Sequence, residues 1–256
     1  MAKSAKEIAD WLRQRVGAAG VRGIVVGLSG GIDSAVVIGL AQMAAPGQAL
    51  GVIMPCGSDS QDEADARLVA EHFGVPVLRV DLAPPYDALV GALRTAMASL
   101  PPDMAPAAAS PDPDPRARMP LANIKPRLRM STLYYVANTL HYLVAGTGNR
   151  AELTIGYFTK YGDGGVDVLP IGDLLKSDVR AMARELGVPD RIVEKPPSAG
   201  LWAGQTDEGE MGMTYAELER YLTGGPDAVA PALALRLERM IRASDHKRTT
   251  PPSPGE

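Results

Sequence analysis

Short apolar runs recur along the chain and predict its strands. The runs 23–28, 49–55, 75–82 and 141–147 are mostly apolar, and 23–28 is especially rich in β-branched residues. Such runs are typical of strands buried on both faces of a parallel sheet. A shorter run at 166–170 predicts a fifth strand.

Helical periodicity fills the intervals between these runs. Amphipathic stretches cover 4–18 and 175–187, and the second ends at Gly187. Further helices are expected over 35–45, from a cap at Ser58 or Asp59 to about His72, over 86–99, around 127–134, from 149 onward, and over 214–222 and 231–243. Alternating strands and helices predict a single doubly wound α/β domain over 1–256, with a mainly parallel sheet flanked by helices.

Three segments break the pattern. Residues 101–120 contain seven prolines and few large apolar residues, so we expect a disordered Pro-rich insertion. Residues 196–212 are rich in glycine and acidic residues and predict a flexible loop. The Pro-rich end, 249–256, is expected to be a flexible tail.

Composition narrows the class of protein. Of the 256 residues, 46% are hydrophobic, enough for a sizeable core, and the net charge of −4 disfavours a general nucleic-acid binder. The single cysteine, Cys56, cannot form an internal disulfide, which favours a reducing compartment. We find neither a secretory signal nor an apolar run approaching 18 residues, so we expect a cytoplasmic protein without a membrane partner.

The segment Gly-Leu-Ser-Gly-Gly-Ile-Asp-Ser at 27–34 carries the strongest chemical signal. It joins a predicted strand to a helix, where glycines allow close approach of an anion and free N–H groups can bind phosphate. The spacing fits neither the Walker A loop nor the dinucleotide fingerprint. Asp33 falls in the first helical turn and could hold Mg²⁺ against the phosphates. The alternative is an ordinary Gly-rich helix start.

The same segment resembles the loop of the ATP pyrophosphatase superfamily, whose members cleave ATP between the α- and β-phosphates. Three further segments narrow the resemblance: Phe-Thr-Lys-Tyr-Gly-Asp-Gly-Gly at 158–165, Asn-Ile-Lys-Pro-Arg-Leu-Arg-Met at 123–130, and His-Lys-Arg at 246–248. Together they are similar to the ammonia-dependent NAD synthetases. The resemblance covers about 4–250, except 101–120, and implies an adenine-nucleotide α-hydrolase-like fold.

This resemblance implies an activity and a set of site residues. The enzyme would amidate deamido-NAD with ammonia and ATP through an acyl adenylate, releasing AMP and pyrophosphate, and would form a homodimer. ATP would contact Gly27, Leu28, Ser29, Gly30, Gly31, Ile32, Asp33, Ser34, Thr147, Lys176 and Ser198. Deamido-NAD would contact Arg127, Lys160, Asp167, His246 and Lys247. Asp33 and Glu152 would bind Mg²⁺, Lys176 would neutralise phosphate charge, and Asp163 would lie where ammonia attacks.

Each assignment has a plainer alternative. Glu152 could be a first-turn acid favoured by the helix dipole, and Lys160 and Asp163 a solvated pair in a Gly-rich turn. Two departures from the family pattern also stand out. Many members have Gly-Thr-Asp-His-Ala-Ala-Glu where 146–152 has Gly-Thr-Gly-Asn-Arg-Ala-Glu, and many have Thr where Ser198 stands. Both departures retain the hydroxyl and carboxylate groups that the roles need.

Two rival functions remain open. The first is another adenylating ATP pyrophosphatase, such as a tRNA-thiolating enzyme, which the acidic charge and the lack of catalytic cysteines disfavour. The second is a non-catalytic module that binds adenine nucleotides and would release no pyrophosphate. Since 256 residues leave no room for an additional glutamine-hydrolysing domain, we expect free ammonia or a separate partner to supply the nitrogen.

Overall fold

The computed structural model describes residues 3–101, 103–104, 115–198 and 206–254. Within these residues, four parallel strands form one sheet in the order β3-β2-β1-β4. The strands are β1 (Gly23–Gly27), β2 (Ala49–Ile53), β3 (Val77–Arg79) and β4 (Tyr142–Ala145). The predicted parallel sheet is confirmed.

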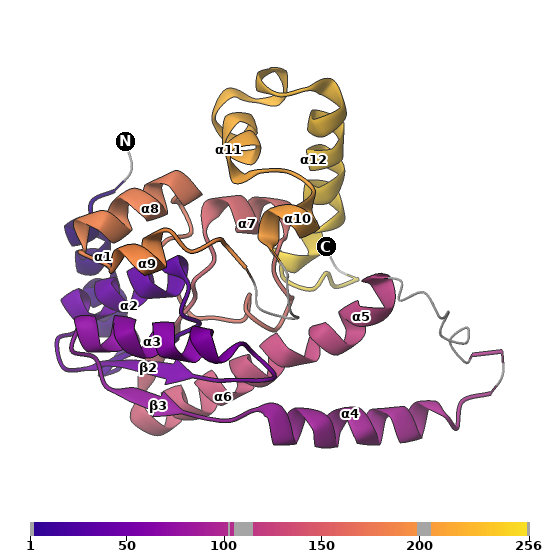
Figure 1. The fold of residues 1–256 in the computed structure, drawn as a ribbon, viewed down its shortest axis with the longest axis horizontal. Coiled ribbons are helices and arrows are strands. Elements are labelled where there is room, and N and C mark those ends of the chain that lie inside the picture. The colour runs from indigo at the N-terminus through magenta and orange to yellow at the C-terminus, as the bar shows by residue number, and fades with distance from the viewer. Residues whose placement is uncertain (1–2, 102, 105–114, 199–205, 255–256) are drawn as a thin grey trace.

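Helices cover both faces of the sheet, as a doubly wound fold requires (Figure 1). Alternate strand residues face opposite ways, so Ile24 and Val26 pack in one apolar cluster and Val25 in the other. The first face is covered by α1 (Ala5–Ala19), α2 (Ile32–Ala44), α3 (Ser60–His72), α8 (Lys176–Glu185) and α9 (Asp190–Val193). The second is covered by α6 (Ile124–Leu140), and Tyr86, near the start of α4 (Ala83–Met97), packs against the same cluster.

Helices beyond the sheet (Figure 1) enclose a third apolar cluster. It joins α7 (Arg150–Ile155) to the C-terminal helices α10 (Asp207–Met211), α11 (Tyr215–Gly224) and α12 (Pro231–Ala243). Short 3₁₀ turns, Pro226–Ala228 and Asp245–Lys247, follow α11 and α12. This helical layer brings residues after 206 against the helix that follows β4.

The predicted fifth strand is wrong. Residues 166–170 contribute only an isolated bridge between Val168 and Ala145. The Asp167 carboxylate accepts the Val144 N–H at 2.8 Å. A side chain therefore occupies a backbone donor that a longer run of strand pairing would use. Pro170 has no N–H to extend the pairing.

Two segments expected to lack regular structure contain helices. Helix α5 (Pro115–Ala122) begins within 101–120. Its end packs against the rest of the protein, because Ala122 is buried and the Tyr86 hydroxyl lies 3.4 Å from the Leu121 carbonyl oxygen. Helix α10 lies within 196–212 and is capped by Thr206, whose side chain accepts the Gly209 N–H. The expectations for 102, 105–114, 199–205 and 255–256 concern residues outside the described ranges.

Local chemistry explains the helix ends that border the site. Asp59 caps α3 by accepting the Gln61 N–H, and Asn149 and Glu152 form a reciprocal capping box at the start of α7. Gly187 follows α8 with a φ of 72°. In the part of the chain that the structure describes, no helix is long and apolar enough to span a bilayer.

Candidate active site

The loop 27–34 presents the start of α2 to an anion. Gly31 occupies the N-cap position, and no side chain of the described residues caps this helix. The buried Ser34 hydroxyl instead donates to the Gly31 carbonyl at 2.9 Å, and Ser29 Oγ accepts the Gly31 N–H at 3.2 Å. The N–H groups of the first turn and the positive end of the helix dipole therefore remain available for phosphate.

Close packing against α3 fixes the shape of this loop. Gly30 has a φ of 76°, and a Cβ at this position would lie 2.4 Å from the Asp62 carbonyl oxygen. Lys195 Nζ lies 3.4 Å from the Gly30 carbonyl oxygen and donates to Asp62 Oδ1 at 2.8 Å and Asp65 Oδ2 at 2.6 Å. No local sequence pattern predicts this ion-pair network, because Lys195 is distant along the chain from Asp62 and Asp65.

A buried ammonium lies between two carboxylates next to the loop. Lys176 is 1% exposed, and its Nζ lies 2.5 Å from Asp33 Oδ2 and 3.7 Å from Glu152 Oε1. Burial alone would lower the pKa of Lys176, but the two carboxylates outweigh burial and raise it. The three residues come from the starts of α2, α7 and α8, which the parallel sheet brings to one edge.

Burial also changes the acid–base character of Glu152. It raises the pKa of this carboxyl to about 8, the Asp33 charge adds to the rise, and Lys176 opposes it. Asn149 orients both acids: its Nδ2 donates to Asp33 Oδ1 at 3.1 Å, and its N–H donates to Glu152 Oε2 at 3.2 Å. Asn149 is one of the departures from the family pattern, and it is fully buried.

The donor set of Asp33 and Glu152 fits a divalent cation held jointly with phosphate. Both carboxylates already converge on one positive charge, and their oxygens are the ligands that Mg²⁺ prefers. Across the described ranges, no group of three or more His, Cys, Asp or Glu side chains could hold a metal ion. A cation here would therefore depend on oxygens from water and substrate phosphates, which is the usual arrangement for Mg²⁺.

The other two residues expected to contact ATP lie near this edge or at the border of the described chain. Val26 pairs with Ala145, so Thr147 follows β4 beside the start of the phosphate loop. Ser198 is exposed and precedes the gap at 199–205. Their contacts with ATP stay predictions.

Most residues expected to bind deamido-NAD form a second group. Arg127 Nη2 donates to the Lys160 carbonyl at 3.3 Å, and Lys160 Nζ donates to the His246 carbonyl. Lys247 Nζ donates to two carbonyls, those of Gly156 and Phe158, each at 2.7 Å. Residues more than 100 positions apart in the sequence are thus brought together.

The C-terminal turn is fixed tightly against the end of α7. Gly156 has a φ of 71°, and a Cβ there would lie 2.1 Å from the Ser244 Cβ. Burial lowers the pKa of the nearby Lys247. Tyr161 also has a left-handed φ, 58°, which is unusual for a non-glycine residue and indicates a constrained turn at 158–165.

The two aspartates of this region have defined partners. Asp163 Oδ1 accepts the Thr159 N–H at 2.9 Å. Asp167 accepts hydrogen bonds from the Tyr134 hydroxyl, at 2.9 Å, and from the Val144 N–H. Burial and the hydrogen bond to Asp167 raise the pKa of Tyr134 to about 12. Asp167 therefore has a structural role at the sheet, in addition to any contact with substrate.

Asp207 and Tyr215 lie beside the site but are not among the residues that the sequence predicts for it. Tyr215 Oη lies 3.1 Å from Glu152 Oε1 and 3.0 Å from Asp207 Oδ2, and both residues are buried. Burial and the surrounding carboxylates raise the pKa of Tyr215, so its hydroxyl keeps its proton. Asp207 lies within the segment 196–212, which the sequence predicts to be a flexible loop, and it belongs to no recognised motif.

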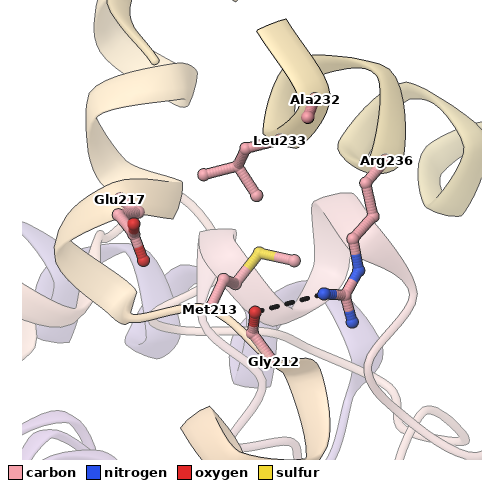
Figure 2. Close-up of a pocket in the computed structure, with 6 residues that line it drawn as sticks. All are labelled: Gly212, Met213, Glu217, Ala232, Leu233 and Arg236. Carbon is pink, nitrogen blue, oxygen red and sulfur yellow. Dashed lines mark hydrogen bonds between the residues drawn. The ribbon is translucent and has the colours of Figure 1, made fainter. Parts of the chain in front are cut away.

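A hollow of about 300 Å³ lies between α11 and α12, apart from the predicted site residues (Figure 2). Arg236 lines it and donates to the carbonyls of Gly212, at 3.1 Å, and Met211, at 2.5 Å. These bonds fasten α12 to the end of α10. The remaining lining residues are Met213, Glu217, Ala232 and Leu233.

Comparison with known proteins identifies the family to which the chain belongs. The NAD synthase family profile matches residues 4–251. An NH(3)-dependent NAD(+) synthetase of Carboxydothermus hydrogenoformans is 50% identical over 97% of this chain and 96% of its own. Among solved structures, NMN synthetase from Francisella tularensis matches with a TM-score of 0.86 and 34% identity, over 98% of this chain and 97% of its own. NAD+ synthetase from Burkholderia pseudomallei matches with a TM-score of 0.74 and 32% identity, over 98% and 92%. The chain therefore belongs to the NAD synthase family.

Proposed function

We propose that the protein is an ammonia-dependent NAD synthetase, which converts deamido-NAD to NAD with ATP and releases AMP and pyrophosphate. One observation carries the proposal: a buried lysine and two carboxylates meet at the anion-binding start of α2, in a chain half identical to a curated enzyme of this name. This arrangement suits a reaction in which negative charge builds up on a departing pyrophosphate.

The first step activates the substrate. A nicotinate carboxylate oxygen attacks the α-phosphorus of ATP, and the bond to the β-phosphate oxygen breaks. The N–H groups of 27–34 and the Lys176 ammonium would stabilise the leaving charge, with Thr147 and Ser198 as further ATP contacts. Asp33 and Glu152 would hold Mg²⁺, which supplies Lewis-acid stabilisation to the phosphates.

The second step forms the amide. Ammonia attacks the carbonyl carbon of the acyl adenylate, a proton leaves the nitrogen, and AMP departs with the bridging oxygen. We assign Asp163 to orienting ammonia or accepting the proton, because its carboxylate lies in the constrained turn at 158–165. A carboxylate alone is unreactive toward amines, which is why activation must come first.

The group of Arg127, Lys160, His246 and Lys247 would bind the phosphates and ribose of deamido-NAD. Its support is the set of hydrogen bonds by which Arg127, Lys160 and Lys247 join three segments that are distant in the sequence. Asp167 would add a contact from its position beside β4. Phosphate groups favour such paired cations.

We further propose a homodimer in the cytoplasm. Leu89, Leu93 and Met97 lie on one face of α4 at intervals of four residues, and they are 40%, 44% and 47% exposed. Figure 1 shows α4 extending away from the sheet, where a second copy could cover this face. The free, buried Cys56 is compatible with a reducing compartment.

A second candidate substrate is the deamidated mononucleotide, nicotinic acid mononucleotide. The observation that favours it is the high TM-score to the solved NMN synthetase. The chemistry at the carboxylate would be identical, and only the binding of the adenylate half would differ.

Purified protein with Mg-ATP and ammonium separates these functions. The two substrates are supplied in turn, and kcat/KM is measured from the NAD or NMN formed. We expect a higher value with deamido-NAD. A preference for the mononucleotide favours the second candidate, and ATP binding without AMP release supports the non-catalytic module.

A further inference from the structure

Tyr215 contacts two of the three charged side chains at the proposed cation site, Glu152 and Lys176, but not Asp33. Its hydroxyl lies 3.1 Å from Glu152 Oε1, and its ring centroid lies 4.8 Å from Lys176 Nζ. The same hydroxyl lies 3.0 Å from Asp207 Oδ2. A single side chain from α11 therefore links the starts of α7, α8 and α10.

Tyr215 is itself held firmly. It is 2% exposed and packs in the apolar cluster with Leu218 and Leu237. Its backbone N–H donates to Glu208 Oε1 at 2.9 Å. The bonds from Arg236 to the carbonyls of Gly212 (Figure 2) and Met211 brace the neighbouring turn. The hydroxyl therefore occupies a fixed position relative to the carboxylates.

Glu152 needs this contact to keep its direction. Its Oε2 is engaged by the Asn149 N–H in the capping box, and its Oε1 lies toward Lys176. The terminal torsion of a glutamate is broad, so one bond at Oε2 does not fix where Oε1 points. The Tyr215 hydroxyl, whose one proton is shared between Glu152 Oε1 and Asp207 Oδ2, supplies the second constraint on the carboxylate.

We propose that Tyr215 is a positioning residue for the divalent-cation site and that it acts through Glu152. The inference rests on the proposed function in taking Glu152 as a cation ligand. The hydroxyl sets the orientation of the carboxylate, and the ring supports the Lys176 ammonium from one side. The C-terminal helices are thereby coupled to cation binding, although they contribute no ligand in this assignment.

The test is Tyr215→Phe, which removes the hydroxyl and keeps the ring. Tyr157→Phe is the matched control, because the Tyr157 hydroxyl bonds to Asp207 Oδ1 at 3.4 Å and to Glu210 Oε2 at 2.8 Å rather than to Glu152. The readout is Mn²⁺ affinity in the presence of a non-hydrolysable ATP analogue, measured by electron paramagnetic resonance, because the cation is shared with the phosphates. Loss of an outer partner of a metal ligand weakens affinity about 10–100-fold. We expect this loss for Tyr215→Phe and near wild-type affinity for Tyr157→Phe.

A second comparison guards against a general folding defect. In a Glu152→Gln background, Tyr215→Phe should cause little further loss of Mn²⁺ affinity, because the carboxylate it positions is already gone. Circular dichroism melts of all variants show whether each is folded. Unchanged affinity in Tyr215→Phe, an equal loss in Tyr157→Phe, or an undiminished further loss in the Glu152→Gln background overturns the proposal. Wild-type protein that binds Mn²⁺ but forms no NAD would instead refute the proposed function.

Discussion

Replacing Lys176 by Met should destabilise the metal-free protein as well as impair catalysis. The substitution keeps the length of the side chain but removes the positive charge between Asp33 and Glu152. Lys176 is 1% exposed, and the two carboxylates are 18% and 16% exposed, so water can replace little of the lost interaction.

The size of the effect follows from this burial. Removing one partner of a buried ion pair costs about 3–5 kcal/mol of unfolding free energy. For a chain of this length, each kcal/mol lowers Tm by about 2–4 °C, so the loss should be roughly 6–20 °C in EDTA. Mg²⁺ should restore part of the loss, because a bound cation compensates the same carboxylates and stabilises the folded state.

Thermal melts by circular dichroism, in EDTA and in Mg²⁺, measure the effect. Lys6→Met is the control, since Lys6 is 83% exposed and its ion pair with Asp10 contributes little. If Lys176→Met melts at the same temperature as Lys6→Met in EDTA, the ammonium does not hold the carboxylates as described. Equal losses with and without Mg²⁺ would contradict the shared cation site.

Two further variants test other parts of the site. Asp163→Asn should lower amide formation about 10²-fold while pyrophosphate release continues, because an amide accepts a proton poorly. A wild-type ratio of NAD to pyrophosphate at limiting ammonium would show that Asp163 does not handle ammonia. Lys195→Met should weaken binding of a non-hydrolysable ATP analogue about tenfold in calorimetry, because its ammonium joins the Gly30 carbonyl to α3, and Lys195→Arg should recover part of the affinity. Unchanged affinity in Lys195→Met would show that the phosphate loop keeps its shape without this contact.

The sequence predicts the layers of this fold because buried parallel strands have a strong local signature. The runs 23–28, 49–55 and 141–147 each contain an observed strand, and the helix predicted at 231–243 has those bounds. The run 75–82 contains only Val77–Arg79 as a strand; β3 lies at one edge of the sheet and pairs with β2 alone. Hydrogen bonds between residues distant in the sequence, such as that from Val144 to Asp167, determine where strands end. Such bonds produce no periodic pattern in the sequence.

The phosphate loop and its acids are predictable because their spacing follows one strand–helix junction. Tyr215 and Lys195 are not, since each acts on the site from an element remote in sequence and belongs to no recognised motif. Tyr215 also follows a polar segment expected to be a loop, so its burial depends on packing with α7 and α12. In the sequence Asn149 stands out only as a departure from the family pattern, whereas its contact with Asp33 gives it a positioning role.

Transfer of ¹⁸O from deamido-NAD to AMP tests the central claim most directly. The substrate is labelled in both oxygens of its nicotinate carboxylate and incubated with the protein, Mg-ATP and ammonium, and the products are analysed by mass spectrometry. Adenylation predicts one ¹⁸O in each AMP, one retained in the amide of each NAD, and equal amounts of AMP, pyrophosphate and NAD. Unlabelled AMP, or ADP and phosphate in place of AMP and pyrophosphate, would contradict the account.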